Sequence, residues 1–138
     1  MPFDFVASPG FDGSTVKRRR AERGLGNHLA GHAAEAAVAR LYESRGVAIC
    51  ARNWRGSRAE IDLVGRQGDT VVFIEVKQSQ THDRAASHLS QAQIARIFGA
   101  VEEFVASEPN GLLTDVRIDL ALVDGQGRIE VLENAFAG

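Results

Sequence analysis

The sequence lacks several features that would define whole classes of protein. It has one cysteine, Cys50, so no disulfide can form within the chain, and the apolar stretch GVAIC predicts a small buried thiol in a reducing compartment. No apolar run approaches the roughly 18 residues that a membrane helix needs, and the N-terminus has no apolar signal-peptide segment. We therefore expect a cytoplasmic protein with no membrane partner.

Positive charge is scarce for a protein that would bind nucleic acid by bulk electrostatics. The formal net charge is −2, so any contact with DNA must be local. The one basic run, KRRRAER, lies in a leading segment with Pro, Gly and Ser and no clear periodicity. We interpret residues 1–26 as a flexible basic N-terminal arm, either solvated or following a phosphate backbone. Residues 27–138 then form a single domain.

Hydrophobic periodicity predicts an α/β fold with a defined order of elements. Helical spacing of apolar residues extends from Asn27 to Arg45, with a stripe of Leu29, Ala33, Ala37 and Leu41 that Val38 and Tyr42 widen. It recurs from Ser90 to Ser107. Strand patterns are present at 47–54, 59–64, 70–77, 115–123 and 129–132. The order of helix, three-strand meander, helix and strand indicates a mixed sheet flanked by helices.

Charged residues interrupt the most apolar part of the chain, AEIDLVGRQGDTVVFIEVK. Side chains alternate along a strand, so Glu75 and Lys77 point to the same side. If residues 66–69 form a tight turn, the strands pair antiparallel with Glu60 roughly opposite Glu75, which leaves Asp62 a diagonal neighbour. Two carboxylates and one amine would then meet where a strand leaves the core.

Two neighbouring carboxylates repel each other unless one is protonated or a cation lies between them. Mg²⁺ or Mn²⁺ on Asp62 and Glu75 would meet that need, and Lys77 would orient or help deprotonate a water that attacks a phosphodiester. Glu35 flanks the apolar stripe of the first helix and can reach the same site. The alternative is a structural Asp–Lys–Glu ion network at a strand end, with Glu35 solvated.

Candidate contacts with nucleic acid surround the turn after the first strand. An aromatic side chain among arginines can stack on an unpaired base, and the residues concerned are Arg52, Trp54, Arg55 and Arg58. A tryptophan that caps the edge of the core is the alternative interpretation. His32, near Glu35 on the first helix, is a further candidate contact with substrate phosphate.

Two other groups of polar residues have simpler interpretations. His28 and His32 have the spacing of a zinc-binding H-E-x-x-H helix, but Leu29 stands where that motif needs its glutamate. Arg117 and Asp119 share the non-core face of the fourth strand, where we expect a structural pair.

Several motifs occur in an order that resembles a known family. GHAAE in the first helix, RNWRGSRAEIDLV, VVFIEVK, VRIDLALV and the closing ENAFAG resemble the YraN-like family of uncharacterised bacterial proteins. That family is similar to PD-(D/E)xK nucleases, which have a restriction-endonuclease-like fold, and especially to archaeal Holliday-junction resolvases. The resemblance implies a restriction-endonuclease-like core in which Asp62 and Glu75 bind metal, Lys77 is the catalytic lysine and Glu35 is an additional helix acid.

The chain departs from the family pattern at two places that would contact phosphate. Ser79 stands where the family often has an arginine, and the second helix offers Gln91, Gln93 and Arg96 where a basic residue is common. Gln93 and Arg96 are the candidate contacts with nucleic acid on that helix. Two hypotheses follow. The first is a metal-dependent endonuclease that hydrolyses phosphodiester bonds in structured or branched DNA, as a homodimer if it resolves junctions. The second is a non-catalytic nuclease-fold module that binds DNA or a protein partner.

Overall fold

A computed structural model describes residues 17–79 and 90–136, and for residues 17–30 it describes the backbone course alone. Its helices are α1 (Lys17–Ser44), α3 (Gln91–Val105) and the short 3-10 helix η1 (Gly111–Leu113). Its strands are β1 (Ala48–Arg55), β2 (Glu60–Gln67), β3 (Thr70–Gln78), β4 (Val116–Val123) and β5 (Ile129–Leu132).

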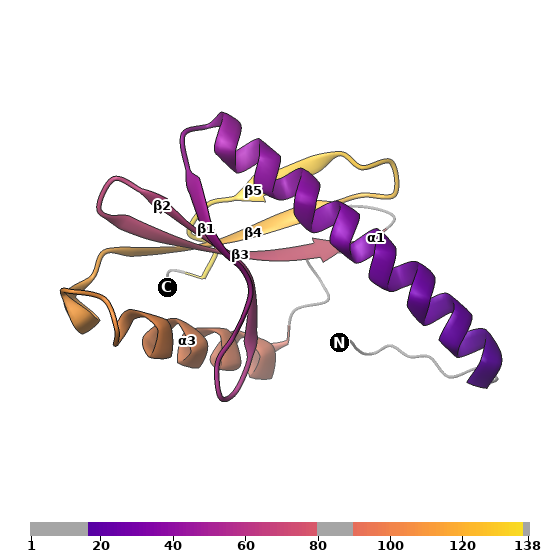
Figure 1. Ribbon diagram of the computed structural model, residues 1–138, viewed down its shortest axis with the longest axis horizontal. Coiled ribbons are helices and arrows are strands. Elements are labelled where there is room, and N and C mark those ends of the chain that lie inside the picture. The colour runs from indigo at the N-terminus through magenta and orange to yellow at the C-terminus, as the bar shows by residue number, and fades with distance from the viewer. Residues whose placement is uncertain (1–16, 80–89, 137–138) are drawn as a thin grey trace.

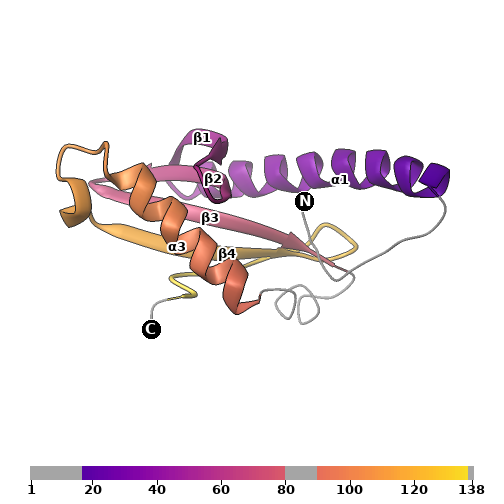
Figure 2. The ribbon, with the colours of Figure 1, turned by 90° about the horizontal axis from the view of Figure 1, so that it is seen from below.

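The strands form one mixed sheet in the order β1-β2-β3-β4-β5. The β3–β4 pair is parallel and the other pairs are antiparallel. Helix α3 lies between β3 and β4 in the chain, and α1 and α3 lie on opposite sides of the sheet (Figure 1, Figure 2). This is the predicted mixed sheet flanked by helices, and it is compatible with a restriction-endonuclease-like core.

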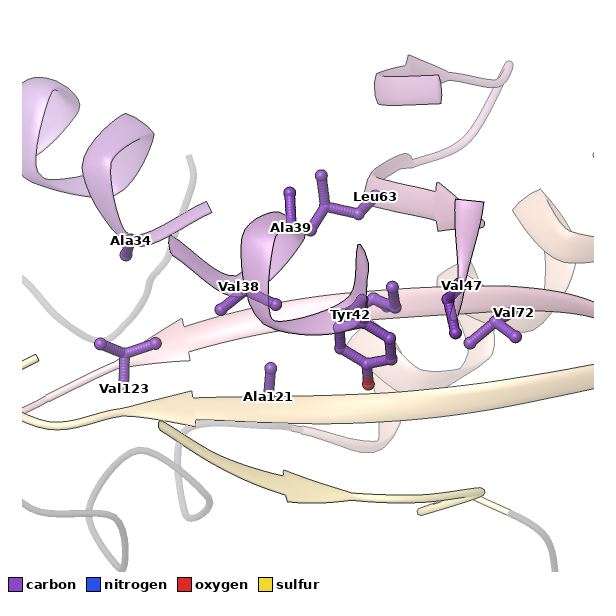
Figure 3. Packing of buried hydrophobic residues seen from close by; sticks show 10 residues of the cluster. Ala34, Val38, Ala39, Tyr42, Val47, Leu63, Val72, Ala121 and Val123 are labelled. Atoms are coloured by element: carbon purple, nitrogen blue, oxygen red, sulfur yellow. The ribbon is translucent and has the colours of Figure 1, made fainter. Parts of the chain in front are cut away.

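Helix α1 packs on one face of the sheet along a stripe of buried residues. This α1-side core contains Ala34, Val38, Ala39, Tyr42, Val47, Leu63, Val72, Ile74, Ala121 and Val123 (Figure 3). Of the predicted stripe, Val38 and Tyr42 are buried as expected, but its centre was wrong by about one residue, because Ala33 is exposed and Ala37 and Leu41 are half-buried. The helix also begins at Lys17 instead of Asn27. Residues 1–16 of the predicted arm lie outside the described residues.

Helix α3 packs on the other face. This α3-side core contains Ile61, Val64, Val71, Phe73, Ile97, Ala100, Val101, Val105 and Ile118. The helix begins with a capping box, in which Ser90 Oγ accepts the Gln93 N–H at 3.1 Å and Gln93 Oε1 accepts the Ser90 N–H at 3.0 Å. Gln93 therefore has a structural task at the start of the helix.

A buried carboxylate links α1 to the sheet. Asp119 in β4 has no solvent exposure. It accepts hydrogen bonds from Tyr42 Oη at 2.7 Å, Arg117 Nε at 3.0 Å and the Asn134 N–H at 2.9 Å. Burial raises the pKa of Tyr42, and the hydrogen bond to Asp119 raises it further. The pair with Arg117 was predicted, but the expectation that it lies on a non-core face was wrong, because α1 covers that face.

Two expectations from composition are also addressed by the structure. Cys50 is exposed, not buried, because it lies at an irregularity of the edge strand β1, where the register shifts between Ile49 and Ala51. Within residues 17–79 and 90–136, no helix is long and apolar enough to cross a membrane.

We expect Tyr42→Phe to lower the free energy of unfolding by about 1–3 kcal/mol, because a buried carboxylate loses one donor. Equilibrium unfolding in urea, followed by circular dichroism, measures the change. Glu43→Gln, the next residue of α1 and exposed, is the matched control and should change the free energy by less than about 0.5 kcal/mol. A Tyr42→Phe protein as stable as the wild type would contradict this role of the hydroxyl.

Candidate carboxylate site at the end of strand β3

Strand β3 carries charge where it leaves the core. Val71 to Ile74 are fully buried, whereas Glu75 and Lys77 are on the border of the interior, with exposed side-chain fractions of 15% and 11%. Lys77 Nζ lies 3.7 Å from Glu75 Oε2, as the alternation of side chains along the strand predicted. A carboxylate and an ammonium group therefore lie side by side where little solvent reaches them.

Asp62 lies beside them because the β2–β3 ladder ends early. The ladder ends at the pair of Leu63 and Ile74. Beyond that pair the Val76 N–H donates to Asp62 Oδ2 at 2.8 Å, so a carboxylate takes the place that a backbone carbonyl of β2 would hold in a continued ladder. The Asp62 side chain is thereby fixed in position by the backbone of β3.

The predicted register between these strands was wrong by two residues. We expected a turn at residues 66–69 with Glu60 opposite Glu75. Instead Gln67 pairs with Thr70 across a two-residue turn, in which Gly68 has φ of 61°. This tighter turn brings Asp62, and not Glu60, level with Glu75.

Two further carboxylates join through an asparagine of β1. Asn53 Nδ2 donates to Glu35 Oε1 and to Glu60 Oε2, both at 3.1 Å. Arg55 Nη2 donates to Glu60 Oε1 at 3.1 Å. Helix α1 and strands β2 and β3 thus contribute a carboxylate cluster of four residues, Glu35, Glu60, Asp62 and Glu75.

Burial dominates the electrostatics of this cluster. It raises the pKa of Asp62 well above the usual range, and the charges of Glu75 and Glu35 raise it further. Burial also raises the pKa values of Glu75 and Glu35. Lys77 and a hydrogen bond from Asp62 act in the opposite direction on Glu75. In the absence of a bound cation the cluster therefore favours at least one shared proton.

The donor set fits a hard divalent cation that keeps part of its water shell. Within the described residues, no three His, Cys, Asp or Glu side chains form a ready-made metal cage. Mg²⁺ needs fewer protein ligands than such a cage supplies, because it is usually held by one or two carboxylates with waters and substrate phosphate. Asp62 Oδ2 is held by the Val76 N–H, which leaves Oδ1, together with Glu75, to face a cation. A cation there would also relieve the repulsion that raises these pKa values.

The arginines proposed for DNA do not all reach this site. Arg52, Arg55 and Arg58 are exposed, and Arg55 is joined to the cluster through Glu60. Arg58 lies beside α3, since a Cβ added at Gly99 would be 3.9 Å from its Cδ. The hairpin formed by β1 and β2 therefore places its arginines at different distances from the carboxylates.

The remaining candidates also separate into two groups. Trp54 packs edge-on against Phe104 at a centroid distance of 5.2 Å, which corresponds to the core-capping alternative. Gln93 belongs to the capping box of α3. His32 and Arg96 are exposed, and the charge of His32 lowers the pKa of Glu35. The side chain of His28 lies outside the part of the chain whose side chains are described.

Sequence reasoning missed Asn53 as the residue that joins the acids. Its φ of 50° is rare outside glycine, and Asn is among the few residues that tolerate it. An asparagine inside a predicted strand was the available signal, because Asn is depleted from strands. It identifies an irregular position but not the partners of the side chain.

We expect Asp62→Asn to raise the free energy of unfolding of the metal-free protein at neutral pH, by on the order of 1 kcal/mol. Asn keeps an oxygen for the Val76 N–H and removes a repelled charge. Because folding raises the pKa of Asp62, the wild type loses stability as pH rises from the unfolded value of about 4 through the higher folded value. The advantage of Asp62→Asn should therefore be small near about pH 4 and grow toward neutrality.

Urea unfolding in EDTA across that pH range measures the difference. Asp69→Asn, in the exposed turn before β3, is the matched control and should show no such gap. An Asp62→Asn protein less stable than the wild type at neutral pH would indicate a structural ion network instead.

Comparison with known proteins gives the chain a family. The profile of the uncharacterised protein family UPF0102 matches residues 34–123, a span that contains the whole carboxylate cluster. A UPF0102 protein of Ruegeria pomeroyi is 56% identical over 116 residues, which cover 84% of this chain and 94% of that protein. One of Cereibacter sphaeroides is 57% identical over 111 residues, 80% of this chain and 95% of that protein. One of Dinoroseobacter shibae is 46% identical over 123 residues, 89% of this chain and 92% of that protein. The resemblance to YraN-like proteins is thereby confirmed, and the chain belongs to the uncharacterised protein family UPF0102.

Proposed function

We propose that this protein is a metal-dependent endonuclease that hydrolyses phosphodiester bonds in structured or branched DNA. One observation carries the proposal: Asp62 and Glu75 are held together at a strand end with raised pKa values, and Lys77 Nζ lies 3.7 Å from Glu75. Such an arrangement of like charges opposes folding, so it calls for a ligand that offsets the charge. A divalent cation with a phosphate diester has the required chemistry.

The residues divide the work by their position. Asp62 and Glu75 would hold Mg²⁺ or Mn²⁺, with Glu35 completing the set from α1. A bound ion supplies Lewis-acid stabilisation of negative charge on the phosphate and favours ionisation of a water. The Lys77 ammonium orients that water and stabilises charge on the phosphate oxygens as the transition state forms.

The reaction balances without a further co-reactant. The water oxygen forms a bond to phosphorus while the bond from phosphorus to the leaving sugar oxygen breaks. One proton leaves the attacking water for solvent, and the leaving oxygen takes up another. Glu35, half-buried and hydrogen-bonded to Asn53, is placed to orient the water or to hold its proton on the way out.

DNA is the proposed substrate because the exposed basic side chains lie on elements that also build the site. Arg52 and Arg55 belong to β1, and His32 lies one turn from Glu35 on α1. Arg58 and Arg96 would extend the contact toward α3. Local contacts of this kind suit a protein with a net charge of −2 and a bent or branched duplex better than a long straight one. Symmetric cutting of a junction would require a homodimer.

A second function has its own support. Ser79 stands at a position where a basic residue would grip phosphate, and Gln93 is engaged in the capping box of α3. Both reduce the grip on a substrate without changing the fold. The second candidate is therefore a non-catalytic module that binds DNA or a protein partner.

Metal binding is the first test. We expect Mg²⁺ or Mn²⁺ to stabilise the wild type by about 2–3 kcal/mol at roughly a hundred times the dissociation constant. The same titration of Asp62→Asn should give no stabilisation, because the ion loses a charged ligand. Differential scanning fluorimetry measures both, with Ca²⁺ and EDTA in parallel. Equal stabilisation of both proteins would place the ion elsewhere.

Cleavage is the second test. Labelled single strand, duplex, flap and four-way junction are incubated with the protein and Mn²⁺ or Mg²⁺. We expect one branched structure to be cut, with Glu75→Gln and Lys77→Gln slower by at least about a hundredfold because each removes transition-state stabilisation. Glu43→Gln, exposed on α1, should cut like the wild type. DNA that is bound but never cut, by a protein that still binds metal, would favour the binding module.

A further inference from the structure

Asn53 has a backbone conformation that a β-strand does not normally contain. Among the described residues, the non-glycine residues with positive φ are Asn53 (φ 50°) and Asn134 (φ 51°). Asn134 lies in the turn that follows β5, where such a conformation is ordinary. Asn53 lies inside β1, two residues from its end. A left-handed residue within a strand turns the chain that follows it.

The strand pairing shows what this turn does. Arg52 pairs with Leu63 and Trp54 pairs with Ile61, so Asn53 lies across from Asp62. In a regular strand, residues three apart point to opposite faces. Here both strands break that rule at this level, because Ala51 and Trp54 both pack on the α3-side core, as do Ile61 and Val64. At Asn53 and Asp62 the β1–β2 pair therefore changes which face of the sheet its side chains point to, and we call this change the roll of the pair.

Beyond this roll the hairpin continues toward α3. The Ser57 N–H donates to Glu103 Oε1 at 2.9 Å, so the tip of the hairpin is attached to the helix on the far side of the sheet (Figure 1). Before the roll, β1 and β2 lie under α1, whose Tyr42 and Val38 pack with Leu63. Asn53 is thus located where the hairpin passes from one helix to the other.

The side chain of Asn53 joins the elements that meet there. One NH₂ group has two hydrogens, so Nδ2 can serve Glu35 and Glu60 at once, at 3.1 Å each. Because Asp62 lies directly across from Asn53 in the β1–β2 pair, the Glu35 carboxylate that the amide holds is also brought next to Asp62. The amide therefore ties the acid of α1 to Glu60 of β2, at the level of Asp62.

We propose that Asn53 is a positioning residue for the divalent-cation site: its left-handed backbone turns the β1–β2 pair so that Asp62 reaches β3, and its amide holds Glu35 against Asp62. This inference rests on the proposed function, because metal binding is what the positioning serves. Asn53 does not itself need to contact the ion.

Two substitutions separate the backbone role from the amide role. Asn53→Gly keeps the left-handed conformation and removes the amide, whereas Asn53→Ala removes the amide and adds backbone strain. In EDTA, both should unfold cooperatively, with a lower midpoint for Asn53→Ala than for Asn53→Gly. Equal midpoints would overturn the claim that the conformation matters. Asn134→Gly is the matched control, because it makes the same change at the other left-handed asparagine, away from the site.

Manganese affinity, measured by calorimetry or by the enhancement of water-proton relaxation, reports on the amide. We expect Asn53→Gly to weaken Mn²⁺ binding at least about tenfold, as loss of a partner that orients a metal ligand commonly does, while Asn134→Gly binds like the wild type. Glu35→Gln should weaken binding too, and the double variant Asn53→Gly, Glu35→Gln should be no weaker than Glu35→Gln alone, since Asn53 acts through Glu35.

The outcomes separate this inference from the function on which it rests. Wild-type affinity in Asn53→Gly, with metal binding intact, overturns the inference and leaves the proposed nuclease untouched. Independent losses that multiply in the double variant also overturn it. A wild type that binds no Mn²⁺ overturns the proposed function and this inference with it.

Discussion

The hydrogen bond from the Val76 N–H to Asp62 is the constraint on which the site depends. Where β2 and β3 stop pairing, a strand would normally leave backbone groups to water. Here a carboxylate satisfies one of them, and in doing so it is held beside Glu75 although both are partly buried and repel each other. The two cores on either face of the sheet supply the stability that this local repulsion reduces. The fold can hold the acids together because the cost is confined to a strand end.

Asp119, which is buried, and Asp62, which is partly buried, show how different the same side chain can be within one sheet. Asp119 is surrounded by donors: Tyr42 Oη, the Arg117 guanidinium and the Asn134 N–H all point to it. Asp62 has one backbone donor, the Val76 N–H, and it lies near the acids Glu75 and Glu35 as well as the Lys77 ammonium. A satisfied carboxylate stabilises a fold, whereas an unsatisfied cluster is what catalytic and metal sites require before their ligand arrives. This contrast is the reason that Asp62, and not Asp119, is assigned to the proposed site.

Much of the fold could be predicted, because periodicity reports burial directly: the strands and the second helix lie within a few residues of their predicted bounds. The register of β2 against β3 could not be predicted, since Gly68 allows a two-residue turn where four residues were assumed. That shift decides which acid is level with Glu75. The neighbours Glu75 and Lys77 follow from alternation alone. Asn53 could not be placed, because its partners come from two other elements, and the burial of Asp119 depends on α1 crossing the sheet. Local pattern thus locates the acids, and tertiary contact decides how they are arranged.

The Val76 amide is hydrogen-bonded to a side chain of the site and not to the backbone of a neighbouring strand. Its electronic environment therefore changes with the state of the Asp62 carboxylate. Its amide resonance in a nuclear magnetic resonance spectrum would respond to the protonation of Asp62 and to any ion on its other oxygen, with no label attached to the site. Amides bonded within the β3–β4 ladder, such as those near Phe73 and Ile118, would be silent internal standards. The sheet therefore contains its own spectroscopic probe of occupancy.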